Sequence, residues 1–242
     1  MLPIGEPGES GMNNSFRQLG VLTNWVRSIA CVIGIIVIGN IGIDLYVNHL
    51  LRLIRNGTVE NPSLLMMGMH GANRLQMVLD VGYGALLALN IVLFFFWLHR
   101  AASNTEALGA KGLESSPGWT IGWFFVPVAN LVMPYRAMRE VWQASHSPAQ
   151  WNTVRIGPGL LLWWLIHLFA GIAAQAKSAM LREAHSADAI LAASNVEIAG
   201  MVLSLVATLL FVHIVGSLWS MQEIAWRRQT PALPPLPLAA IA

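Results

Sequence analysis

Residues 198–222 read IAGMVLSLVATLLFVHIVGSLWSMQ, and none of these 25 positions holds Asp, Glu, Lys or Arg. A helix needs roughly 20 mostly apolar residues to cross the hydrocarbon core of a bilayer, so this stretch is long enough. Four further charge-free stretches occupy residues 28–43, 81–99, 115–135 and 156–176. Charged residues make up 11% of the chain, against about 25% in an average soluble domain. The pattern predicts an all-α polytopic membrane bundle and excludes a soluble globular domain, a disulfide scaffold and a disordered chain.

The chain divides into two tails and one domain. Residues 1–20 are rich in Gly, Pro and Asn and predict a flexible N-terminal tail. Residues 21–228 form a single transmembrane helical domain, and the Pro-rich residues 229–242 form a C-terminal tail without a packed core. The N-terminus lacks the pattern of a cleavable signal peptide, so we expect the first apolar stretch to be a retained anchor. We expect Cys31, which lies in that stretch, to be a buried small hydrophobe.

Four of these stretches predict full crossings, which we place at residues 25–46, 81–98, 156–176 and 198–222. The second belongs to a longer helix from about 61 to 104, since Asn61 is a suitable cap and Pro62 a suitable first residue. The Ala-rich link 177–197 fits a continuation of both neighbouring helices.

The remaining stretch differs because prolines break it. Pro117 follows a capping Ser116, Pro127 interrupts the apolar run and Pro134 closes it, so a straight helix is not expected. It is either re-entrant or a fifth crossing. Four crossings put nine Lys and Arg on the side of both termini and five on the other, whereas five crossings give eight against six. The positive-inside rule therefore favours re-entry and cytoplasmic termini. Residues 134–145 predict a short amphipathic helix at the interface.

Residues 97–145 contain four motifs at fixed offsets: W-x-x-R-A-x-x-N, S-P-G-W, G-W-F-F-V-P-x-x-N-L-x-x-P and M-x-E-V-W-x-A-S. This run resembles the DUF4328 family, with a similar core over about 61–146. The resemblance implies a bacterial multi-spanning protein, and hence the bacterial cytoplasmic (inner) membrane, but no reaction. The positions that we expect to shape the broken segment are Pro117, Gly118, Trp119, Gly122, Trp123, Pro127, Pro134 and Trp142.

One candidate site is a polar pocket at the broken segment. Its residues are Arg100, Asn104, Asn130, Arg136, Arg139 and Glu140. If the segment folds back, Arg100 pairs with Glu140, while Asn104 and Asn130 satisfy freed backbone groups. Such pockets bind substrates and ions in transporters. The alternative is that these groups only hold the loop together.

A second candidate is the carboxylate pair Asp44 and Asp80. Each lies ~12–13 Å from the middle of its helix, on the side away from the termini, so the two share one depth. Such a pair can bind a cation or relay protons, or each carboxylate can meet Arg74 or water in the headgroup region. His167 and His213 lie near the middle of their crossings, where they either ligate a haem or, as we expect, make hydrogen bonds between helices.

Motifs of common enzymes are missing from the sequence: it contains no phosphate-binding glycine loop, H-E-x-x-H, C-x-x-C or G-x-S-x-G. We expect no enzyme, no catalytic residue, no metal and no cofactor. The scattered basic residues predict no nucleic-acid partner. The expected function is a non-enzymatic interaction or lipid-contact module, whose partners are the lipid bilayer and a membrane protein or a second copy of the chain. The alternative is a small transporter or ion-conducting protein with its pocket at the broken helix 117–134.

Overall fold

The computed structural model describes residues 15–57 and 62–229. Most of the two predicted tails, residues 1–14 and 230–242, and the predicted cap Asn61 lie outside the described residues. Within the described part every regular element is a helix, which confirms the all-α prediction.

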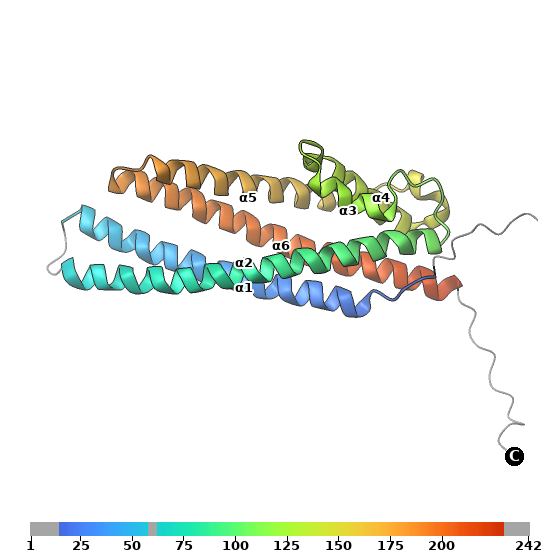
Figure 1. The fold of residues 1–242 in the computed structure, drawn as a ribbon, viewed down its shortest axis with the longest axis horizontal. Helices are drawn as coiled ribbons and strands as arrows, with labels where there is room; N and C mark the ends of the chain where they lie inside the picture. The colour runs from blue at the N-terminus through green and yellow to red at the C-terminus, as the bar shows by residue number, and fades with distance from the viewer. Residues whose placement is uncertain (1–14, 58–61, 230–242) are drawn as a thin grey trace, which may run out of the picture.

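Four long helices build the body of the protein (Figure 1). They are α1 (Gly20–Arg55), α2 (Pro62–Ala107), α5 (Gly159–Arg182) and α6 (Ala187–Gln229). All four are long and apolar enough to cross a membrane. They form two antiparallel hairpins, α1–α2 and α5–α6, and α1 also packs on α6.

The helices continue well past the charge-free stretches. The 46 residues of α2 span about 69 Å at a rise of ~1.5 Å per residue, more than twice the ~30 Å hydrocarbon core of a bilayer. The link 177–197 continues both of its neighbours, as predicted, and leaves only residues 183–186 as a turn. The α1 helix ends at Asn56 and Gly57, where Gly57 has a φ of 65° that favours glycine.

The α5–α6 hairpin is held by a close approach of small residues. A Cβ added to Gly200 of α6 would lie 2.9 Å from the Cβ of Ala173 in α5. Small residues of this kind let two helical backbones pack closely.

The segment between α2 and α5 consists of short helices. These are α3 (Pro117–Gly122), η1 (Trp123–Phe125), η2 (Ala129–Leu131), α4 (Met133–His146) and η3 (Pro148–Thr153). Ser116 caps α3 by accepting a hydrogen bond from the Trp119 N–H, as the sequence indicated. The helical path ends at Phe125, and Val126, the residue before Pro127, is extended. Val128 has a φ of 65°, which is unusual for a β-branched residue. No helix of membrane-crossing length lies in residues 117–134.

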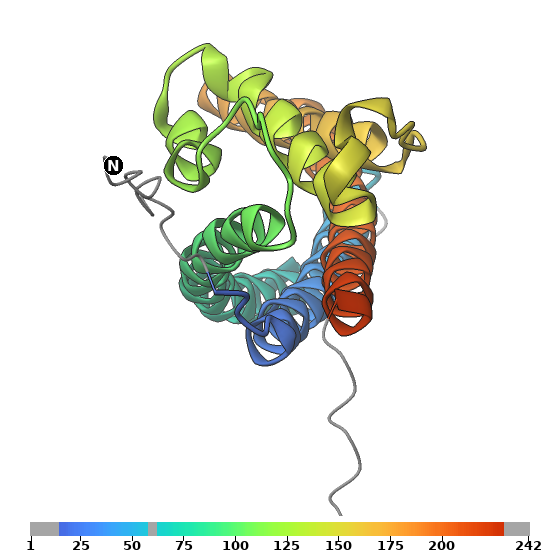
Figure 2. The ribbon, with the colours of Figure 1, turned by 90° about the vertical axis from the view of Figure 1, so that its right-hand side faces the viewer.

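The short helices gather at the end of the bundle where the described chain begins and ends (Figure 2). Phe16, before α1, stacks on Trp226, near the end of α6, with ring centroids 4.6 Å apart. The largest apolar core lies at this end and includes Trp97, Met138 and Leu218, which are fully buried and come from α2, α4 and α6. Cys31, by contrast, is exposed rather than buried as expected, because it lies on an outward face of α1.

We expect Gly200→Ala to lower the thermal unfolding temperature in detergent, because overpacking against Ala173 costs roughly 1–3 kcal/mol. The matched control is Gly42→Ala on α1, where nothing lies within 4 Å of the added Cβ. The control should leave the unfolding temperature unchanged or slightly raised. Equal unfolding temperatures for the two variants would contradict a tight α5–α6 contact at Gly200.

Candidate functional site

The predicted polar-pocket residues are not gathered in one place. Asn104 is buried, and its side-chain oxygen accepts from the Arg17 N–H at 2.9 Å while its amide donates to the Arg17 carbonyl at 2.8 Å. The same amide also donates to Oε1 of Gln222 at 3.1 Å. Asn104 therefore attaches the segment before α1 to α2 and α6, and its partners do not include Asn130.

Gln222 is a central polar residue that the sequence reasoning missed. Its side chain is completely buried, and its Nε2 donates to the Ala101 carbonyl at 2.8 Å and to Oγ of Ser145 at 2.9 Å. Together with Asn104 it joins α2, α4 and α6 in one polar junction. A glutamine at the end of an apolar stretch is only a weak sequence signal for such a junction. Its hydrogen-bond partners lie 77 to 121 positions away in the chain, so local sequence does not reveal them.

Glu140 closes the loop before α3 instead of pairing with Arg100. Its two carboxylate oxygens accept the backbone N–H groups of Glu114 and Ser115. Burial raises the pKa of Glu140 above its ordinary value, although the two N–H groups act in the opposite direction. Arg136 reaches the same loop through an exposed ion pair with Glu114, with N and O atoms 3.3 Å apart.

The other predicted pocket residues are more exposed. Asn130 and Arg139 are exposed, and Arg100 is half-buried. None of the six predicted residues lines the cavity of about 640 Å³ between the long helices or the cavity of about 610 Å³ beside residues 106–119. Of the six, Glu140 and Arg136 contact the loop before α3. A role for the six residues in ligand binding stays a prediction.

The motif residues of the broken segment mainly pack on one another. The rings of Trp119 and Trp123 lie 4.9 Å apart, and the Trp119 ring covers Gly122 so closely that a Cβ there would lie 2.9 Å from it. Gly118 has no such neighbour. Trp142 packs against the large apolar core, and Pro134 is buried near the start of α4.

The two mid-helix histidines have different surroundings. His167 stacks on Trp163 and Trp164, whereas His213 lies 3.5 Å from Oγ of Ser217. Within the described residues, no group of three or more His, Cys, Asp and Glu is arranged to hold a metal ion.

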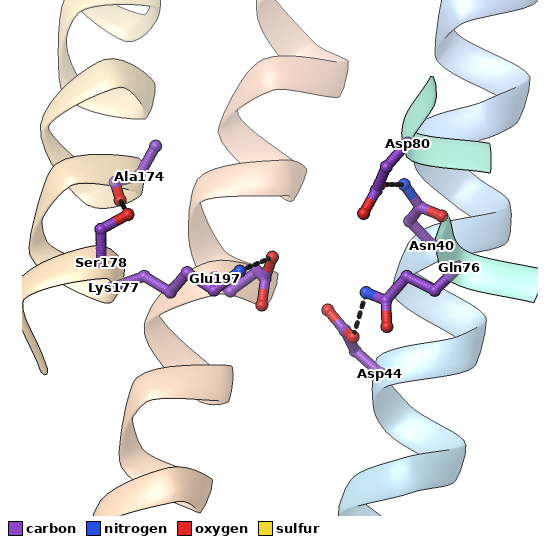
Figure 3. Close-up of polar contacts among 8 residues, drawn as sticks. All are labelled: Asn40, Asp44, Gln76, Asp80, Ala174, Lys177, Ser178 and Glu197. Carbon is purple, nitrogen blue, oxygen red and sulfur yellow. Dashed lines mark hydrogen bonds and ion pairs between the residues drawn. The ribbon is translucent and has the colours of Figure 1, made fainter. Parts of the chain in front are cut away.

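The predicted carboxylate pair lines a cavity between the two hairpins, which we call the inter-hairpin cavity. Its volume is about 640 Å³, and all four long helices contribute to its wall. Asp44 accepts a hydrogen bond from Gln76 at 2.9 Å, and Asp80 accepts one from Asn40 at 2.9 Å (Figure 3). Both bonds run between α1 and α2.

An ion pair faces these carboxylates across the cavity. Lys177 of α5 and Glu197 of α6 lie 2.6 Å apart, and both line the cavity wall. The sequence reasoning did not include them. The sequence nevertheless contained a pattern that could have indicated the four charged residues. Each charge-free stretch of a long helix is bounded, on the side away from the described termini, by one charged residue: Asp44, Asp80, Lys177 or Glu197.

Several buried polar atoms around the cavity lack partners among the described residues. They are Oδ2 of Asp44, both side-chain polar atoms of Asn48, and Oδ1 of Asn40. Asp44 is 5% exposed and Asn48 is 2% exposed. A buried polar atom without a hydrogen bond costs about 1–3 kcal/mol, so a cluster of them is a marked feature of this region.

An all-helical chain with four apolar helices of crossing length fits the class of membrane proteins. The family comparison then identifies it further. The chain belongs to the DUF4328 family, described as a domain of unknown function, whose model matches residues 61–218. The match extends beyond the predicted core of about 61–146 and includes α5 and most of α6. No curated protein and no solved structure matches the chain significantly.

We expect Glu140→Gln to loosen the loop before α3. The amide would place a donor against one of the two backbone N–H groups, at a cost of about 1–3 kcal/mol. Hydrogen exchange followed by mass spectrometry should show faster exchange of the peptide that contains Glu114 and Ser115. Glu114→Gln is the control, because removing one exposed ion pair costs at most ~1 kcal/mol. Equal exchange in both variants would contradict the role of Glu140.

Proposed function

We propose that the protein is a non-enzymatic, multi-pass membrane protein whose broken segment contacts lipid or a membrane partner. Its four long helices cross the bilayer, residues 117–134 enter the membrane and return, and α4 lies along the interface. The nine Lys and Arg on the side of the termini favour a cytoplasmic location for both ends. The family resemblance favours the bacterial inner membrane.

The depth of the broken segment supports re-entry. The Phe124 ring contacts Phe94 at 6.1 Å, Phe95 at 5.3 Å and Trp164 at 6.2 Å between ring centroids. These three residues lie inside charge-free stretches of α2 and α5. Phe94 is only ~6 Å along α2 from the middle of its stretch, so Phe124 packs at a depth that lipid chains surround.

The backbone of the segment is suited to such a depth, because hydrocarbon offers no water to unpaired groups. Nε1 of Trp164 donates to the Leu131 carbonyl at 2.8 Å. The Asn130 N–H donates to the Val126 carbonyl at 2.9 Å, and the Val132 N–H donates to the Ala129 carbonyl at 3.0 Å. Irregular backbone can therefore remain paired away from water.

The observation that carries the proposal is an exposed apolar surface on the outer side of this segment, which we call the apolar crest. Phe125 is 70% exposed and Val128 is 80% exposed. Large exposed apolar patches are rare on soluble proteins, and such a patch usually marks a contact with lipid or with another protein. The members of the crest are Trp119, Phe125, Val128, Leu131 and Val132.

A small transporter is the second candidate. The observation that favours it is the inter-hairpin cavity, whose wall is formed by residues other than those predicted for a pocket at the broken segment.

A spin label at position 128 tests the proposed contact of the crest with lipid. The one native cysteine is removed by Cys31→Ser, and Val128→Cys is labelled in protein reconstituted into nanodiscs. We expect the label to collide more with oxygen than with a water-soluble nickel complex, because oxygen concentrates among lipid chains. Phe169→Cys, on the exposed apolar face of α5, should give the same pattern, and Gln150→Cys in η3 the reverse. A label at 128 that behaves like the one at 150 would overturn the proposed re-entry.

A further inference from the structure

We propose that the inter-hairpin cavity binds a small organic cation, a compound that carries ammonium groups on an aliphatic body. This inference goes beyond the proposed function and does not depend on whether residues 117–134 enter the membrane. It rests on the charge, the unpartnered acceptors and the size of the cavity.

The charge of the wall selects a cation. Three carboxylates line the cavity, from Asp44, Asp80 and Glu197, and Lys177 is the only basic residue among its lining residues. Lys177 is already paired with Glu197 at 2.6 Å. Asp44 and Asp80 receive only amide hydrogen bonds, from Gln76 and Asn40. A carboxylate that is 5% exposed, as Asp44 is, is strongly destabilised without a positive partner.

Side chains that line the cavity carry acceptors for N–H donors. Asp44 and Asn48 are lining residues, and Oδ2 of Asp44 and Oδ1 of Asn48 are buried beside the cavity without a hydrogen-bond partner among the described residues. Oδ1 of Asn40 is also unpartnered and belongs to the side chain that holds Asp80. An ammonium group donates up to three hydrogen bonds, which matches a wall of carboxylate and amide oxygens.

Size and lining favour an organic cation over a bare metal ion. The volume of about 640 Å³ falls within the range of small-molecule sites, roughly 300–1,000 Å³. Among the described residues, no group of three or more His, Cys, Asp and Glu is arranged to hold a metal ion. Apolar side chains between the charged groups can cover methylene groups of a ligand; they are Val47, Leu51, Met77, Val81, Leu181 and Ile190.

Lys177 is expected to weaken the binding of a cation at this site. Its ammonium group neutralises Glu197 and repels a cationic ligand, so it acts as a built-in competitor. Removing its charge should strengthen binding by roughly tenfold, the effect of one unit charge about 8 Å away at an effective dielectric constant of about 30. A gain in affinity cannot result from a damaged fold, which makes this variant especially informative.

Isothermal titration of the purified full-length protein with spermidine, an aliphatic triamine, tests the proposal. The titration is done in detergent at physiological ionic strength. We expect saturable binding that Asp44→Asn and Asp80→Asn each weaken at least roughly tenfold, and that Lys177→Gln strengthens. Asp188→Asn is the matched control, because Asp188 is exposed, pairs with Arg55 and does not line the cavity. It should bind spermidine like the unaltered protein.

Three results would overturn the proposal. The first is the absence of saturable spermidine binding to a protein that runs as a single folded species. The second is undiminished binding by Asp44→Asn, or an equal loss in Asp188→Asn, either of which would indicate binding outside the cavity or general charge attraction. The third is Asp44-dependent binding of Na⁺ or Mg²⁺ without binding of spermidine, which would replace the organic cation by a metal ion.

Discussion

The polar junction around Gln222 is the interaction on which the arrangement of the other parts depends. One buried amide group meets the Ala101 carbonyl, the Ser145 hydroxyl and the Asn104 side chain, so α2, α4 and α6 are held at one end of the molecule. Asn104 extends the junction to the backbone of Arg17 ahead of α1. Because an unsatisfied buried amide is costly, these segments are tied together as a unit. The large apolar core surrounds the same end.

The opposite end of the bundle contains a polar cavity instead of a large apolar core. Only a small apolar cluster around Ile29, Ile33 and Val37 lies between the two ends, and the polar inter-hairpin cavity follows it. Contacts within each hairpin are extensive along its length, as the Gly200 and Ala173 pair illustrates. The described protein therefore combines an apolar, well-buried end around Trp97 and Leu218 with a polar end that contains the cavity. The family match covers residues 61–218, so both regions also use residues outside it: Arg17 and Gln222 at the junction and Asp44 at the cavity.

Much of this architecture could be predicted because the constraints are local. A run without charge must be long enough to cross a bilayer, and Pro117, Pro127 and Pro134 each act on their own backbone. Helix ends were predicted less well: α1 was expected over 25–46 and runs from Gly20 to Arg55, since charged residues beyond an apolar stretch do not stop a helix. The tertiary contacts of individual side chains could not be predicted from the sequence. Glu140 was expected to meet Arg100 but meets two backbone N–H groups, and Cys31 was expected inside because burial is usual for cysteine. On a bundle with an apolar exterior, an apolar position does not have to face inward.

The length of α6 places the polar junction far from the inter-hairpin cavity. Gln222 and Glu197 lie 25 residues apart on one continuous helix, a separation of about 38 Å along its axis. A pivot of only about 5° between the hairpins at the junction would shift the helix positions beside the cavity by about 3 Å, the size of a water molecule. The length of α6 thus separates the polar junction from the inter-hairpin cavity by more than the ~30 Å hydrocarbon core of a bilayer.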